Sequence, residues 1–161
     1  RNTDRDFAFS NDRASAIASE HEATSQEDLD FTCTILVLGK TGVGKSATIN
    51  SIFNEVKAAT DAFQPATKKV AAIVGTVHGI QLRIIDTPGL IPSFAGHCRN
   101  EKIMSSVKKF VRKYPPDLVL YVDRLDMQNN NNSDFPAMKI ITKTFGAAIW
   151  HNACLVLTHC S

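Results

Sequence analysis

Residues 39–46 have the sequence GKTGVGKS, which fills every fixed position of the pattern G-x-x-x-x-G-K-[ST]. Glycines in such a loop leave no Cβ in the way of a bound group, so successive backbone N–H groups can point inward. The lysine of the pattern reaches the β- and γ-phosphates of a nucleotide, and the serine hydroxyl ligates Mg²⁺. The stretch therefore predicts a site for a polyphosphate and a magnesium ion.

The loop and the first turn after it supply most of the predicted nucleotide contacts. These contacts are Gly39, Thr41, Gly42, Val43, Gly44, Lys45, Ser46 and Ala47. The positive end of the following helix favours negative charge at the same place. We also expect Lys45 to act in catalysis, because its charge lies beside the phosphates that react.

Two later segments are expected to complete the magnesium site. In RIIDTPG, residues 83–89, Asp86 ends a buried strand and would hold Mg²⁺ directly or through water, while the Gly89 N–H would contact the γ-phosphate. A second threonine-type ligand is expected between the first helix and the next strand, where Thr60 and Thr67 are available. We favour Thr67, which lies just before that strand, so the predicted metal ligands are Ser46, Thr67 and Asp86.

The elements that must position these residues alternate between strands and helices. The predicted strands are 33–39, 70–77, 80–86, 117–123 and 153–159, and the predicted helices are 45–55, 100–114 and 136–146. A turn at His78-Gly79 makes 70–77 and 80–86 a hairpin. The pattern predicts an α/β fold of the P-loop NTPase type. We expect a three-layer sandwich whose mostly parallel sheet has one antiparallel edge hairpin and is truncated at its C-terminal side.

Length and charge predict one domain behind a polar leader. The chain has 161 residues, 43% of them hydrophobic, which suits one domain with a sizeable core. Residues 1–30 carry three basic and eight acidic side chains and have few large apolar residues, so we interpret them as an acidic linker before a nucleotide-binding domain at 31–161. The sequence shows neither a signal peptide nor an apolar run long enough to span a bilayer.

Several longer stretches resemble one family. ILVLGKTGVGKSATINSIFNEV, IIDTPGLIPS, PPDLVLYVDRLDMQ and TFGAAIWHNACLVLTH are similar to the G domain of the Toc GTPases, the preprotein receptors of the chloroplast outer envelope, and more to the large receptors than to the small ones. The resemblance implies GTP or GDP with Mg²⁺, a GTPase activity, and a location at the cytosolic face of that envelope. It also implies recognition of transit peptides and their transfer to an import channel.

The resemblance assigns roles to three more residues. Thr158 and His159 stand where most small GTPases carry [NT]-K-x-D, and His159 would pack against or hydrogen-bond the guanine base. Arg124 would lie at a dimer interface between Toc GTPases, homo- or heterodimeric, and point towards the partner's nucleotide like an arginine finger. A role in contact or switching, or a simple ion pair with Asp123 or Asp126, remains open for Arg124.

Other features bear on rate and on alternative functions. Leu90 occupies the position of the glutamine that orients water in Ras-like enzymes, so we expect slow intrinsic hydrolysis that depends on partners. A septin-type or immune-associated GTPase acting as a membrane scaffold is the alternative, and an ATP-using P-loop enzyme is a third. The basic helix face at Lys102–Lys113 lacks interleaved aromatic residues, so no nucleic acid or membrane contact is expected there. Any membrane anchor would lie in other regions of the protein.

Overall fold

The computed structural model describes residues 31–54, 69–127 and 135–160. Thr32–Ser161 form one compact unit built around a five-stranded sheet, with strand order β2-β3-β1-β4-β5. The expected magnesium ligand Thr67 and its alternative Thr60 lie outside the described residues.

Most element boundaries agree with the predictions to within two residues. The strands are β1 (Thr32–Gly39), β2 (Ala71–Val77), β3 (Ile80–Asp86), β4 (Leu118–Arg124) and β5 (Ala153–Thr158). The helices are α2 (Lys45–Phe53), α3 (His97–Lys113) and α4 (Phe135–Phe145), with short 3₁₀ turns at Phe94–Gly96, Leu125–Met127 and Ala147–Asn152. The helix α3 begins three residues before the predicted start, because its first turn is polar and lacks the apolar periodicity that marks the rest.

Strand pairing confirms the predicted fold class. The strand β1 pairs in parallel with β3 and with β4, and β4 pairs in parallel with β5. Only β2 runs antiparallel, along β3, within the described sheet. The hairpin between them turns at His78 and Gly79, whose φ angles of 48° and 79° are both positive, as a tight two-residue hairpin turn requires.

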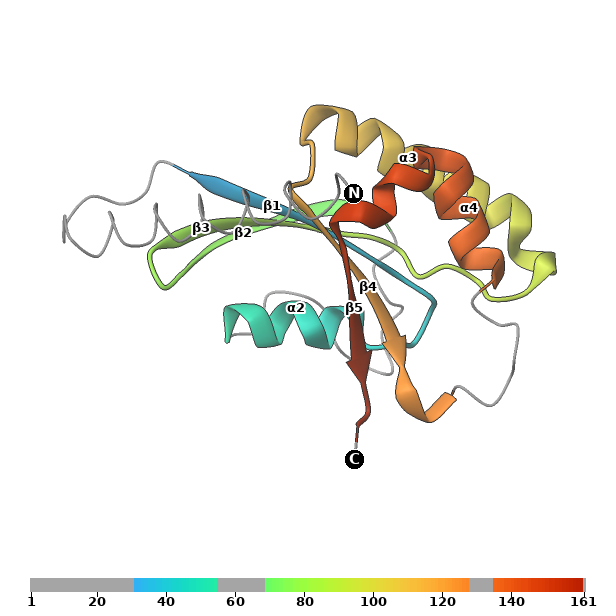
Figure 1. The fold of residues 1–161 in the computed structure, drawn as a ribbon, viewed down its shortest axis with the longest axis horizontal. Coiled ribbons are helices and arrows are strands. Elements are labelled where there is room, and N and C mark those ends of the chain that lie inside the picture. The colour runs from blue at the N-terminus through green and yellow to red at the C-terminus, as the bar shows by residue number, and fades with distance from the viewer. Residues whose placement is uncertain (1–30, 55–68, 128–134, 161) are drawn as a thin grey trace, which may run out of the picture. The chain divides into compact units, whose positions relative to one another are not determined.

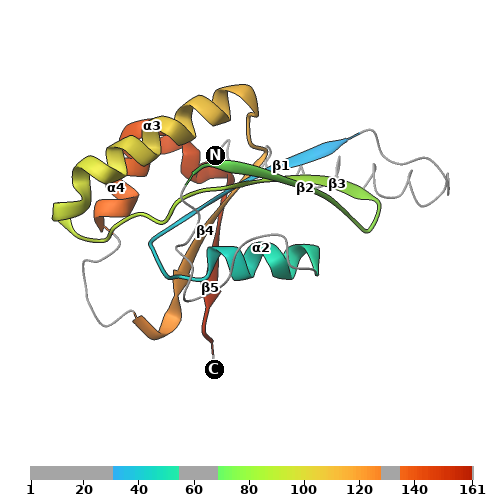
Figure 2. The ribbon, with the colours of Figure 1, turned by 180° about the vertical axis from the view of Figure 1, so that it is seen from behind.

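Helices cover the sheet on both faces and create the three layers. Figures 1 and 2 show α2 on one face and α3 with α4 on the other. Successive side chains of a strand point to opposite faces, so Val37 packs with Ile49 of α2, whereas Leu36 packs with Met104 of α3. A strand that is buried on both sides must be apolar at nearly every position, which explains the continuous run in β1.

The long helix α3 ends where the sequence forbids its continuation. The Tyr114 N–H makes the last helical bond, to the Phe110 carbonyl at 3.0 Å, and Pro115 and Pro116 follow. None of the helices within 31–54, 69–127 and 135–160 combines the length and the apolar character that crossing a bilayer requires.

Candidate functional site

The predicted site residues gather at the carboxyl edge of the sheet. Gly39 ends β1, Asp86 ends β3, and Thr158 ends β5. From β1 the chain goes to β3 on one side and later to β4 on the other, so the strand order reverses at the end of β1. Ligands of open α/β sheets bind at this reversal, and the glycine-rich loop 40–44 lies directly there.

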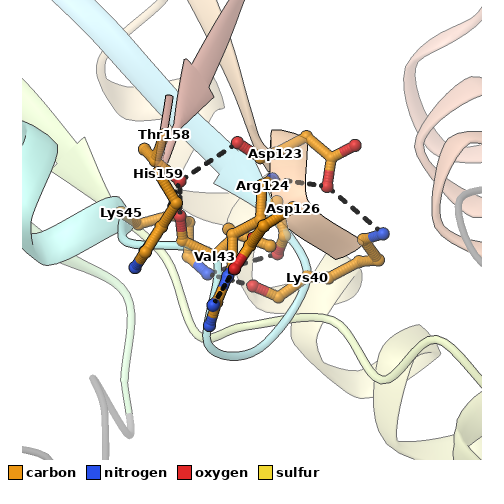
Figure 3. A network of polar contacts seen from close by, with 9 residues as sticks. Lys40, Val43, Lys45, Asp123, Arg124, Asp126, Thr158 and His159 are labelled. Atoms are coloured by element: carbon orange, nitrogen blue, oxygen red, sulfur yellow. Dashed lines mark hydrogen bonds and ion pairs between the residues drawn. The ribbon is translucent and has the colours of Figure 1, made fainter. Parts of the chain in front are cut away.

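Lys45 is buried inside the loop that it follows. Its ammonium group donates to the carbonyl oxygens of Gly39 at 3.2 Å and Lys40 at 2.9 Å, and the side chain belongs to a residue only 8% exposed (Figure 3). Burial lowers the pKa of Lys45 to about 8, although the nearby carboxylate of Asp86 acts in the opposite direction. A phosphate oxygen is a stronger acceptor than these carbonyls, so the lysine is positioned to exchange them for an anion.

The segment after Asp86 lies directly against this loop. A Cβ on Gly89 would approach the Thr41 Cα to 2.6 Å, so only glycine permits the observed contact. Two backbone hydrogen bonds join the segments, from the Thr41 N–H to the Leu90 carbonyl at 2.9 Å and from the Leu90 N–H to the Gly39 carbonyl at 3.0 Å. The glycine that was predicted to contact a γ-phosphate therefore lies beside the phosphate loop.

Leu90 and Asn100 fix the position of that segment. Leu90 is 1% exposed and packs into the core beneath α3, so its side chain serves as an anchor. The buried amide of Asn100 accepts a bond from the Ile91 N–H at 2.9 Å and donates to the Ile91 carbonyl at 2.8 Å. Sequence reasoning missed Asn100, which has no pattern signal beyond a polar residue near a helix start.

Thr158 fastens the loop to the end of β5. Its hydroxyl donates to the Val43 carbonyl at 2.6 Å and lies 3.1 Å from the Asp123 carbonyl oxygen (Figure 3). The neighbouring His159 is exposed, has a positive φ of 55°, and places Nδ1 3.1 Å from the Thr158 hydroxyl. Of this predicted pair, Thr158 is engaged with the loop and His159 presents its ring to solvent.

Arg124 makes an ion pair inside its own chain. Its guanidinium binds both carboxylate oxygens of Asp126, at 2.9 and 2.6 Å. The Arg124 hydrogen bond is the main reason that the pKa of Asp126 lies below its usual value. Asp123 has a different partner, because it forms a buried ion pair with Lys40 at 3.2 Å. The Lys40–Asp123 pair was not predicted, since Lys40 occupies a variable position of the loop motif.

Two of the three predicted magnesium ligands lie in the described site. Ser46 is in the first turn of α2, and Asp86 is 4% exposed at the end of β3. A hydroxyl and a carboxylate are oxygen donors of the kind that Mg²⁺ prefers, with the remaining ligands coming from phosphate and water. The N-terminus of α2, the charge of Lys45 and these two oxygen donors fit a magnesium-bound polyphosphate.

This arrangement defines a P-loop nucleoside-triphosphate-binding domain. The model of the AIG1 family matches residues 33–161, and the chain belongs to that family. It is 62% identical over 160 residues to translocase of chloroplast 101 of Physcomitrium patens, with 99% of this chain and 17% of that relative aligned. It is 60% identical over 159 residues to translocase of chloroplast 120 of Arabidopsis thaliana, with 99% of this chain and 15% of that relative aligned. The chain thus spans about a sixth of these relatives.

The chain is also similar to solved structures of chloroplast translocon components. Toc33 from Arabidopsis thaliana in complex with Mg²⁺ and GMPPNP has a TM-score of 0.69 and 37% identity, covering 86% of this chain and 55% of that one. A structure reported with the statement that dimerization is important for the GTPase activity of the chloroplast translocon components atToc33 and psToc159 also has a TM-score of 0.69, with 38% identity, covering 80% and 50%. At these identities the likeness extends beyond the fold to the family.

Proposed function

We propose that the chain is the GTP-binding and GTP-hydrolysing part of a chloroplast preprotein receptor that acts at the cytosolic face of the outer envelope. The observation that carries the proposal is the phosphate loop, in which buried Lys45 bonds the carbonyls that a phosphate would replace and Gly89 lies against Thr41. The relatives named as translocases of chloroplast support the receptor role, and the complex of Toc33 with Mg²⁺ and GMPPNP supports the ligand.

The phosphate end of the nucleotide is held by residues of three segments. Lys45 leaves its two carbonyl partners and binds the β- and γ-phosphates, while Gly89 donates its N–H to the γ-phosphate. Ser46 and Asp86 hold the magnesium ion, with Thr67 as the proposed third ligand. When bound, Mg²⁺ neutralises charge on the phosphate oxygens.

We assign recognition of the nucleotide base to Thr158 and His159. Thr158 acts indirectly, because its hydroxyl is committed to the Val43 carbonyl and so holds the loop at a fixed distance from β5. His159 is the exposed member of the pair, and we assign to it the contact with guanine. Thr158 and His159 stand where most small GTPases carry [NT]-K-x-D, which is why both residues belong to the proposal.

Slow hydrolysis follows from the position of Leu90. A water-orienting side chain must reach the γ-phosphate, and Leu90 instead lies in the core with 1% exposure. The described site therefore lacks a side chain at this position that could orient the attacking water. We propose that hydrolysis is slow in the monomer and that a partner accelerates it.

Arg124 is the residue that we propose to contact that partner. Its bond to Asp126 is exposed to solvent, and exposed ion pairs contribute little to stability, so exchanging Asp126 for a group on another G domain costs little. Dimers with the same or another Toc GTPase would then place Arg124 near the partner's nucleotide. Sedimentation of wild type, Arg124→Ala and the control Arg112→Ala in the presence of GMPPNP tests this, and equal association of all three contradicts it.

The proposal also includes the precursor proteins that the receptor recognises and the channel to which it passes them. We assign transit peptides of plastid precursors as cargo and the import channel as the next partner, since the relatives are translocases of chloroplast. A septin-like or immune-associated scaffold is the alternative, and the names of these relatives do not describe it. Cross-linking of a transit peptide to the full-length receptor, with and without GTP, tests the assignment.

Nucleotide competition is the first experiment. Labelled GDP is displaced by GTP, GDP or ATP, with and without Mg²⁺, from wild type, from Lys45→Ala and from the surface control Lys108→Ala. Displacement by guanine nucleotides alone, together with loss of binding in Lys45→Ala only, supports the proposal. Equal displacement by ATP contradicts the guanine assignment and favours an ATP-using enzyme.

A further inference from the structure

A groove with a strongly basic rim runs along α3 on the side that faces the start of β2. Its volume is about 820 Å³, and we call it the basic groove. Five cationic side chains line it, namely Lys69, Arg99, Lys102, Lys109 and Lys113. None of the described residues that line it is acidic. The groove thus concentrates positive charge that the described part of the chain does not neutralise.

The floor of the basic groove is apolar. Val70, Ile103 and Phe110 line it between the cations, and Pro88 of the segment before Gly89 also contributes. The single acidic residue of α3, Glu101, lies outside the groove, where it is engaged by Lys143 at 3.0 Å and His97 at 3.2 Å. A ligand that suits this surface has negative charges along its edges and apolar groups between them.

We propose that the basic groove binds an acidic segment of a partner protein, with apolar side chains of that segment lying on the floor. The cations on α3 extend from Arg99 to Lys113, which corresponds to about 21 Å along a helix. An extended peptide of about six residues covers that length. The charge complementarity and the length of the rim together specify a linear acidic segment.

Other ligand classes match this surface less well. A single phosphate group is far shorter than the rim, and a flat bilayer does not enter a concave floor. Single-stranded nucleic acids are bound by a positively charged groove in which several aromatic side chains stack on the bases. Phe110 is the one aromatic residue of the described lining, and its ring already packs against Tyr114 with centroids 5.4 Å apart. Transit peptides are rich in arginine and poor in acidic residues, so the groove repels them and their site lies elsewhere.

The test measures peptide binding to the nucleotide-free protein, so its outcome does not depend on the nucleotide assignment. The probe is a fluorescein-labelled peptide of alternating glutamate and leucine, compared by anisotropy with a glutamine-leucine version. The groove variant carries Lys102→Glu and Lys109→Glu. The matched control carries Lys108→Glu and Arg112→Glu, which make the same charge change on exposed positions of α3 outside the groove.

We expect the acidic probe to bind wild type and the control, and the groove variant to bind about tenfold more weakly or worse, because each reversal turns an attraction into a repulsion. Binding should also weaken as salt is added. Equal weakening in both variants, or equal binding of the glutamine-leucine peptide, overturns the proposal. A peptide of residues 1–30 of this chain is tested as a competitor. If it displaces the probe at much lower concentration than the unlabelled glutamate-leucine peptide does, a partner protein is not the occupant.

Discussion

Raising the pH above 8 should weaken nucleotide binding through the loss of charge on Lys45. In the nucleotide-free domain the pKa of this residue is about 8, because burial disfavours its charged form. A bound polyphosphate favours the charged form and raises the pKa again. The nucleotide therefore binds the protonated protein, and the protonated fraction decides the apparent affinity.

The size of the effect follows from that fraction. At about pH 9, one pH unit above the pKa, only about one free molecule in eleven carries the charged lysine, against about ten in eleven near pH 7, so the apparent Kd rises about tenfold between these pH values. The corresponding loss of binding free energy is about 1.4 kcal/mol. Binding at this pH should also take up nearly one proton per site.

A fluorescent GDP analogue and calorimetry in two buffers of different ionisation enthalpy measure both quantities. The matched control is Lys45→Arg, whose guanidinium stays charged throughout this range, so its affinity should vary only with titration of the guanine ring itself. The ratio of the wild-type affinity to the Lys45→Arg affinity at each pH removes the effect of guanine titration and leaves the effect of lysine titration. A ratio that stays constant between pH 7 and pH 9.5 would refute the reasoning.

Protonation of Lys45 should also affect the stability of the nucleotide-free domain. The folded pKa of about 8 lies below the unfolded value of 10.5, so the unfolded chain binds more protons between these two values. The contribution of Lys45 to the unfolding free energy therefore rises with pH across this window, by up to about 3 kcal/mol. Urea unfolding of wild type and Lys45→Met at both ends of the window measures it, and a constant difference between the two proteins contradicts it.

Three predictions concern the segment beside the phosphate loop. Leu90→Gln should lower the unfolding free energy by about 2–4 kcal/mol, because it places an amide in the core, and should not speed single-turnover hydrolysis; a faster rate would show that the residue reaches the water. Asn100→Ala should cost about 1–3 kcal/mol in urea unfolding by leaving the backbone groups of Ile91 without their buried partner, and an unchanged midpoint would contradict this. Gly89→Ala should weaken GMPPNP more than GDP, because the new Cβ would lie 2.6 Å from the Thr41 Cα and push the segment away from the γ-phosphate; equal weakening would place the damage elsewhere.

The elements of this fold are predictable because each has a local cause. The hairpin turn needs two residues at positive φ, and His78 and Gly79 adopt such angles between the strands β2 and β3. The helix α3 stops before Pro115-Pro116 because proline cannot extend it. The phosphate loop is the strongest case, since each fixed residue of G-x-x-x-x-G-K-[ST] has its own part in binding a phosphate or Mg²⁺.

The contacts that hold the site together are not predictable in the same way. Thr158 reaches the carbonyl of Val43 across 115 residues of sequence, and Lys40 of the phosphate loop pairs with Asp123 of β4. Such pairs depend on how neighbouring strands align, which no local pattern records. The sequence therefore identified Thr158 as a site residue through family resemblance alone, and the structure assigns it a contact with the loop.

Lys40 of the phosphate loop pairs with Asp123, and Asp123 and Arg124 are adjacent residues of β4. The phosphate loop and the proposed dimer contact are therefore connected to the same strand. Thermodynamic reciprocity then constrains how nucleotide binding and partner binding can affect one another. Whatever factor a partner at Arg124 applies to the affinity for nucleotide, the nucleotide must apply to the affinity for that partner. A single pair of binding curves, measured in each direction, is enough to determine how strongly the association of two copies of this domain and the nucleotide state of each depend on one another.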